Sequence, residues 1–152
     1  VLWMRLLAGS ASARYHRVLG SNWQPDEALA DLAARQLGYV SHLAAFLRER
    51  AFRPWAMRPD HGVVIAAENI DAALPMCAAD RTACAVLVYN EEPQPRRELT
   101  LALPGVPSVA LWLDPATGEQ VAAAPTPGDG QPGLTWRVPP AFEQAVLVCQ
   151  TL

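Results

Sequence analysis

The segment WLDPATGE contains residue types that could bind a carbohydrate. The indole ring of Trp112 could stack on a sugar face, and the carboxylates of Asp114 or Glu119 could accept hydrogen bonds from its hydroxyl groups. The same segment also predicts a hairpin: Asp114 accepts from a backbone N–H two residues on, Pro115 suits a type I turn, and Gly118 takes a positive φ. We expect a structural hairpin, with sugar binding as the alternative.

The acidic residues do not form the pair that glycoside hydrolysis requires. A retaining enzyme places two carboxyl groups about 5 Å apart, one of them with a raised pKa. Asp26 and Glu27 are expected in the first turn of a helix, and Glu91 and Glu92 in a solvated turn. No serine lies in a Gly-x-Ser-x-Gly segment. The sequence therefore predicts no catalytic residue.

The histidines and cysteines do not show the spacing of metal ligands, so no metal and no cofactor are expected. His42 and His61 are expected to be structural or solvated. Cys77 and Cys84 flank a short polar turn and could form a disulfide in an exported protein, the alternative being two small buried thiols. Cys149 lies in an apolar strand and is expected in the core.

The composition excludes several classes of partner. The chain has 152 residues, of which 51% are hydrophobic and 18% charged, so it can bury a core. Its net charge is −3, and its 12 basic residues are all dispersed arginines, which gives no footprint for nucleic acid. The sequence has no apolar run long enough to cross a membrane. We expect neither nucleic acid nor membrane as a partner.

The first third of the chain predicts one long helix. Pro25 lies near its start, Arg48 and Arg50 lie in its last turn, and Pro54 ends it near Arg53. The helix is expected to span about 25 residues, or roughly 37 Å. Its apolar residues recur at spacings of three and four, which predicts a single apolar stripe: Leu29, Leu32, Ala33, Leu37, Val40, Leu43, Ala44 and Leu47.

The remainder of the chain predicts short strands separated by proline and glycine. The continuous apolar run from Val86 to Tyr89 and the alternation of LTLAL are typical of such strands. Together they predict an antiparallel β-sandwich of about seven strands. The predicted strands are Gly62 to Ala67, Ala83 to Asn90, Glu98 to Leu103, Ser108 to Leu113, residues 119 to 123, Leu134 to Val138 and Gln144 to Gln150.

Several short motifs resemble one protein family. They are the hairpin WLDPATGE, a Gly-rich loop, the ending VPPAFEQAVLVC, the linker segments RPW and RPD, and the passage LLAGSASARYH. Together they resemble the C-terminal region of apiosidase-like bacterial glycoside hydrolases, whose final β-sandwich is named as the collagen-binding domain of a collagenase. The family's usual Asp-Trp before the last strand is Gln144-Ala145 in this chain.

The resemblance implies an α+β fragment with two parts. Residues 1–56 would be the end of a (β/α)8 barrel, comprising its last strand and the long helix, and residues 57–152 an accessory β-sandwich packed on that barrel. The start of the chain without Met agrees with this expectation. The parent protein would be a secreted or periplasmic glycoside hydrolase acting on a polysaccharide or oligosaccharide, and the fragment alone would be inactive.

The resemblance also implies substrate contacts near the predicted last barrel strand. Active-site residues of such barrels lie at the C-terminal ends of the strands. The residues at this position are Arg14, Tyr15, His16 and Arg17, and Trp23 could stack on a sugar at the rim of the barrel. The catalytic carboxylates would come from earlier barrel strands. Trp55, at the junction of the two parts, is expected to be buried and to anchor the sandwich to the helix.

Two further hypotheses remain open. The chain could be a free-standing module that binds a glycan or a matrix protein, or a small structural protein without a ligand. A binding module should expose aromatic side chains, with Trp112 and Trp136 as the first candidates. An accessory domain should bury them and leave an apolar helix face without a partner.

Overall fold

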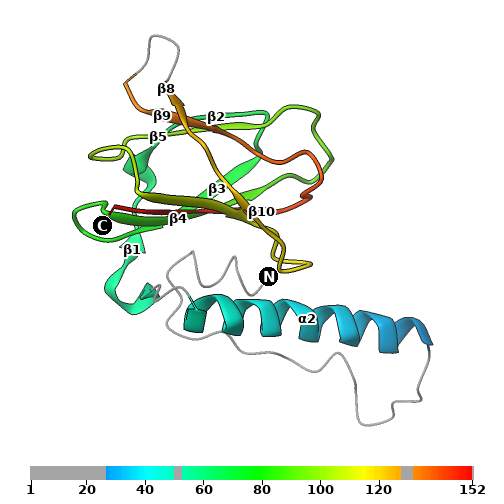
Figure 1. Cartoon of the computed structure of the whole chain (residues 1–152). Coiled ribbons are helices and arrows are strands. Elements are labelled where there is room, and N and C mark those ends of the chain that lie inside the picture. The colour runs from blue at the N-terminus through cyan, green and yellow to red at the C-terminus, as the bar shows by residue number, and fades with distance from the viewer. Residues whose placement is uncertain (1–26, 50–52, 128–131, 152) are drawn as a thin grey trace.

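The fold is α+β, with one α-helix and two antiparallel sheets among the residues that can be described (Figure 1). A computed structural model describes residues 27–49, 53–127 and 132–151. The helix lies on one side of the six-stranded sheet, and the four-stranded sheet lies on the other side. The sheets do not close into a barrel.

Helix α2 extends from Glu27 to Glu49 and has 23 residues. It confirms the predicted long helix within the described residues. Arg48 lies in its last turn, where a cation is favoured by the helix dipole. A short 3-10 helix, η1, follows at Pro54–Ala56.

The six-stranded sheet has the order β1-β3-β4-β10-β6-β7, and its registered pairs are antiparallel. Strand β10 occupies the centre and pairs with both β4 and β6. These three strands are the apolar runs that the sequence predicts as strands. The strand bounds are β1 Arg58–Pro59, β3 Ala72–Cys77, β4 Ala83–Tyr89, β6 Val109–Leu113, β7 Gln120–Ala122 and β10 Ala145–Gln150.

The four-stranded sheet has the order β2-β5-β9-β8. Its strands are β2 Val64–Glu68, β5 Glu98–Leu101, β8 Thr126–Pro127 and β9 Leu134–Arg137. A second 3-10 helix, η2 at His61–Val63, leads into β2. The chain passes between the two sheets at six connections: β1–β2, β2–β3, β4–β5, β5–β6, β7–β8 and β9–β10.

The predicted number of strands is too low, and β3 is the strand of more than two residues that was missed. Its sequence AALPMC contains Pro75, which normally argues against a strand. The carbonyl oxygen of Pro75 accepts a hydrogen bond from the backbone N–H of Asp60 (3.3 Å). In an antiparallel strand the N and O of one residue face the same neighbour. The missing N–H of Pro75 therefore faces the β1 side, and the pairing with β4 loses no bond.

One apolar cluster lies between the two sheets. Leu99 and Trp136 extend into it from the four-stranded sheet, and Val86, Trp112 and Leu147 from the six-stranded sheet. All five side chains are buried. This cluster is the core that joins the two sheets.

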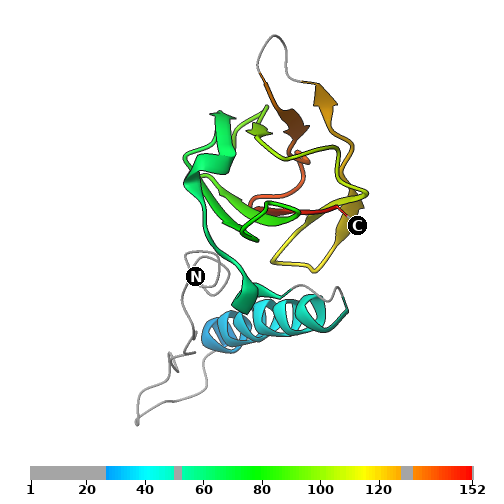
Figure 2. The same ribbon diagram turned by 90° about the vertical axis from the view of Figure 1, so that its left-hand side faces the viewer.

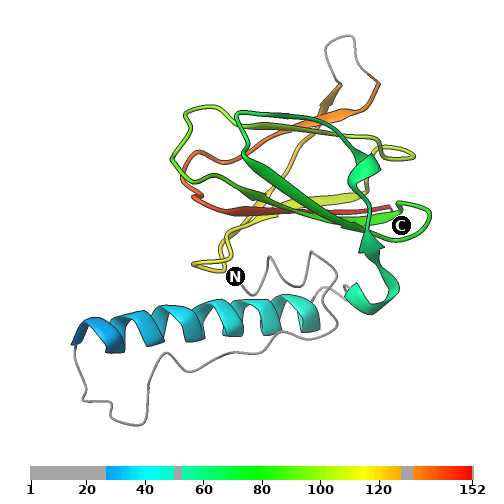
Figure 3. The same ribbon diagram turned by 180° about the vertical axis from the view of Figure 1, so that it is seen from behind.

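The opposite face of the six-stranded sheet holds a second cluster, which packs against α2 (Figures 2 and 3). Phe46 of the helix is 1% exposed and lies among Leu111 and Leu113 of β6. Trp112 and the partly buried Ala110 instead belong to the first cluster. The side chains of β6 therefore alternate between the two clusters, and the six-stranded sheet is apolar on both faces.

Only part of the apolar stripe of the helix packs against the sheet. Leu43, Phe46 and Leu47 form or border the buried cluster. Leu37 is 57% exposed and Val40 is 36% exposed. The predicted apolar stripe is therefore only partly covered by the described residues.

The two helix faces predict unequal effects of truncation. Phe46→Ala should lower the free energy of unfolding by about 3–5 kcal/mol, because it opens a cavity between helix and sheet. Leu37→Ala, the matched control on the same helix, should change it by less than about 0.5 kcal/mol. Urea unfolding followed by circular dichroism measures both values. Equal losses would contradict the docking of the helix through Phe46.

Candidate functional site

The substrate contacts predicted from the resemblance lie outside the described residues. These are Arg14, Tyr15, His16, Arg17 and Trp23. Their roles stay predictions, and the candidate site is built below from residues 27–49, 53–127 and 132–151.

The WLDPATGE hairpin is structural, as expected. One carboxylate oxygen of Asp114 accepts from the backbone N–H of Ala116 (2.7 Å), and the other accepts from the hydroxyl of Thr117 (2.9 Å). The backbone N–H of Gly118 donates to the carbonyl oxygen of Asp114 (2.8 Å). Gly118 has a φ of +77°. Asp114 is buried and both of its oxygens are engaged within the turn.

His42 connects this hairpin to helix α2. Its Nδ1 lies 3.4 Å from the carbonyl oxygen of Pro115. A Cβ atom added at Gly118 would lie 2.8 Å from the His42 ring. The close approach and the positive φ both require glycine at this position. His42 therefore has a structural role, and His61 is exposed.

The tryptophans do not form an exposed binding strip on the sheets. Trp112 is 2% exposed and Trp136 is 0% exposed. The expectation for Trp55 is wrong, since this side chain is 79% exposed. Met57, two residues further on, packs against the cluster around Phe46 in its place.

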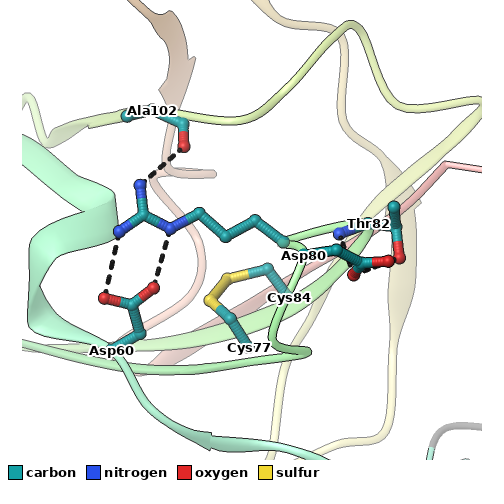
Figure 4. The surroundings of a disulfide bond; sticks show 7 residues. Asp60, Cys77, Asp80, Thr82, Cys84 and Ala102 are labelled. Carbon is teal, nitrogen blue, oxygen red and sulfur yellow. Dashed lines mark hydrogen bonds and ion pairs between the residues drawn. A yellow bond between two sulfur atoms is a disulfide. The ribbon is translucent and has the colours of Figure 1, made fainter.

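The carboxyl groups with a resolved shift all have a lowered pKa. A bidentate ion pair with Arg81 lowers the pKa of Asp60, with distances of 2.7 and 3.1 Å (Figure 4). Hydrogen bonds from Thr82 lower the pKa of Asp80. The pKa of Glu98 is lowered by the side chains of Arg96 and Arg137. A general acid needs a raised pKa instead, so these three carboxylates have the electrostatics of ion pairs and turns.

Cys77 and Cys84 form a disulfide beside this ion pair (Figure 4). The two residues face each other across β3 and β4, with Cα atoms 4.2 Å apart. Of the two possibilities that the sequence leaves open, the structure has the disulfide. Cys149 is a buried free thiol, as expected, and burial raises its pKa to about 12.

A cleft of about 210 Å³ lies between the β4–β5 and β9–β10 connections. Its lining combines buried Asn90, Arg97 and Phe142 with exposed Glu92 and Glu143. Both connections pass from one sheet to the other, so the cleft lies at one end of the two sheets. The cleft combines buried polar groups with access to solvent.

Arg97 and Asn90 are the polar groups that define this cleft. The Arg97 guanidinium donates to three backbone carbonyl oxygens, those of Pro139, Phe142 and Glu143. Burial lowers the pKa of Arg97. The amide nitrogen of Asn90 donates to the carbonyl oxygen of Asn69 (2.9 Å). Its side-chain oxygen is buried and has no partner among the described residues.

Sequence reasoning missed this cleft. Arg97 lies in the polar run EEPQPRRE, whose composition is typical of a solvated loop. Its burial arises from the carbonyl oxygens of a connection more than forty residues away in the chain. No local sequence pattern predicts such a long-range contact.

Other classes of site receive no support within the described ranges. His, Cys, Asp and Glu do not gather there in a group that could hold a metal ion. No helix in the same ranges is both long and apolar enough to span a membrane. The sequence matches no protein-family model and no curated protein.

The Asp60–Arg81 pair predicts an acid-sensitive contribution to stability. Because Arg81 lowers the pKa of Asp60 in the folded state, the unfolded chain binds more protons in acid, and the stabilisation is lost as pH falls through the folded pKa. Asp60→Asn should cost about 1 kcal/mol at neutral pH, and this difference from wild type should fall toward zero as pH falls through the lowered folded pKa of Asp60. Urea unfolding from neutral pH down through this pKa measures the difference.

Glu92→Gln is the control for this prediction, since it removes an exposed carboxylate at a distant loop. It should leave the pH dependence unchanged. A constant difference between wild type and Asp60→Asn at every pH would contradict the assignment.

Proposed function

We propose that this chain is the C-terminal part of a carbohydrate-active glycoside hydrolase of the apiosidase-like kind. In this proposal residues 57–152 are a non-catalytic β-sandwich that stabilises a (β/α)8 barrel, and α2 is the last barrel helix. One observation carries the proposal: α2 has a buried apolar side toward the sheet and an exposed apolar stripe at Leu37 and Val40.

The exposed stripe favours a second packing partner for the helix. Leu37, Val40 and the exposed Ala44 follow the spacing of three and four of one helix face. Exposed apolar area costs about 25 cal/mol for each Å² that could be buried. An outer helix of a (β/α)8 barrel packs on the barrel strands. This arrangement would bury the stripe while Phe46 holds the helix on the sheet.

The burial of the tryptophans and the lowered pKa values of the carboxylates support an accessory role. Trp112 and Trp136 are buried in the core between the sheets and offer no platform for a sugar ring. The carboxylates with resolved shifts have lowered pKa values, the opposite of a general acid. Catalysis would then depend on carboxylates of earlier barrel strands. The proposed polysaccharide or oligosaccharide contacts remain Arg14, Tyr15, His16, Arg17 and Trp23.

The disulfide supports a secreted or periplasmic location for the protein. Cys77 and Cys84 are paired in the structure. Such bonds persist in oxidising compartments and are rare in reducing ones.

A second candidate is a module that binds a glycan or a matrix protein, and the cleft at Asn90 favours it. The side-chain oxygen of Asn90 lacks a donor, Gln94 is half-buried, and Arg97 forms part of the lining. Glu92 and Glu143 add acceptors at the rim. Mixed donors and acceptors beside the ring of Phe142 suit a hydroxylated ligand about the size of one sugar unit.

The accessory role predicts that the exposed helix stripe stabilises a longer protein. The coding sequence upstream of Val1 should encode alternating strands and helices with carboxylates at strand ends. In that longer protein the double variant Leu37→Asp, Val40→Asp should lower Tm by about 5 °C, because it places charges in an apolar interface. Scanning calorimetry measures the shift, and aryl-glycoside hydrolysis reports the activity.

The matched control is Val106→Asp, at an exposed apolar position in the β5–β6 connection and not on the helix, which should leave Tm unchanged. An initiation codon directly before Val1 would contradict the proposal. Equal changes in Tm for the stripe variant and the control would contradict the role of Leu37 and Val40 as the docking surface, but not the proposal that a barrel precedes this chain.

The binding alternative predicts local changes at the cleft. Titration of the protein with a panel of monosaccharides should shift the backbone amide resonances of residues 91–94 and 141–143 in NMR spectra. Asn90→Ala should weaken this response by about tenfold, since one buried hydrogen bond is worth about 1–1.5 kcal/mol. Unchanged spectra at saturating sugar would exclude a monosaccharide ligand.

A further inference from the structure

Three cysteines form a row across neighbouring strands of the six-stranded sheet. Cys77 of β3 pairs in register with Cys84 of β4, and Cys84 pairs in register with Cys149 of β10. All three belong to the core cluster between the two sheets, so their side chains lie on the same face. The central cysteine therefore has a cysteine neighbour on each side, one bound to it and one free.

The hydrogen bonds of the sheet show that the two neighbours of Cys84 are paired differently. The N–H of Ala78 donates to the oxygen of Ala83, next to the Cys77–Cys84 pair, which is therefore a non-hydrogen-bonded pair. The N–H of Thr151 donates to the oxygen of Thr82, two positions from the Cys84–Cys149 pair. Because pairs alternate, Cys84–Cys149 is a hydrogen-bonded pair.

This pairing places Cys149 within bonding reach of Cys84. The Cα atoms of a hydrogen-bonded antiparallel pair lie about 5.5 Å apart, and disulfides bridge Cα separations of about 4.4–6.8 Å. Cys77 and Cys149 are separated by two strand spacings, or roughly 9–10 Å, which is too far. Register alone thus allows two disulfides, both of which contain Cys84.

We propose that Cys149 can undergo intramolecular thiol–disulfide exchange with the Cys77–Cys84 bond, so that Cys84 can be bonded to either neighbour. The Cys149 thiolate attacks the sulfur of Cys84, and a new bond forms between these two sulfurs. The bond between Cys77 and Cys84 breaks, and Cys77 leaves as a thiolate that takes up a proton. One disulfide and one thiol are present before and after, so no oxidant or reductant is consumed.

The closed core suppresses this exchange. Cys149 is 2% exposed, and its thiol must lose a proton before it can attack. Opening of the sheet at β10 would admit water and permit ionisation. Exchange would then replace a cross-link that closes the short β3–β4 hairpin with one that closes a longer loop containing β5 to β9. The new disulfide would join β10 covalently to β4.

Disulfide mapping of the wild-type chain tests the proposal. The protein is held without added oxidant at urea concentrations below its unfolding midpoint, quenched with acid, digested and analysed by mass spectrometry. The Cys84–Cys149 peptide should appear with urea and exceed the Cys77–Cys149 peptide at least tenfold. Equal amounts of these two peptides would indicate random scrambling and overturn the proposal, as would the Cys77–Cys84 peptide alone at every concentration.

Two variants give an independent test. Cys77→Ala, refolded with oxidised glutathione, should form the Cys84–Cys149 disulfide and keep a native near-ultraviolet signal from its buried tryptophans. Cys149→Ser, the control, should retain the Cys77–Cys84 disulfide under all conditions. Two free thiols in natively folded Cys77→Ala would overturn the proposal. If Cys77→Ala does not fold, the wild-type mapping decides.

Discussion

The structure depends on a sheet that must be covered on both faces. Strands β4, β6 and β10 have apolar side chains on each side, so neither face can be left in water at low cost. The four-stranded sheet covers one face and helix α2 covers the other. This requirement binds the helix to the sheets, although the sequence assigns them to separate parts. Leu37 and Val40 form the exposed stripe, the part of the apolar helix surface that is not used to cover the sheet.

Local patterns predicted the elements that depend on local physics. The hairpin at Asp114 follows from turn chemistry, and strand β6 follows from its apolar sequence, so both predictions are confirmed. Strand β3 was missed because Pro75 is tolerated only through its position beside β1, which is a tertiary fact. The cleft was missed for the same reason, since the burial of Arg97 depends on carbonyl oxygens distant in the chain.

The polar groups at the two ends of the sheets differ in whether they have hydrogen-bond partners. At the β3–β4 turn, Asp60 and Arg81 satisfy each other in a bidentate ion pair that lies beside the disulfide. At the other end, the side-chain oxygen of Asn90 is buried and has no partner among the described residues, and the guanidinium of Arg97 donates to backbone carbonyl oxygens. A buried unsatisfied group is costly and uncommon in native proteins. This is the end to which the glycan-binding alternative proposed above assigns its ligand.

The position of β10 also affects how the chain is synthesised. This strand is the last of the described strands to leave the ribosome, yet it lies between β4 and β6 in the finished sheet. Until it emerges, both of those strands have an unpaired edge, and such edges promote association between chains. A nascent chain would therefore be most prone to association with other chains just before β10 emerges.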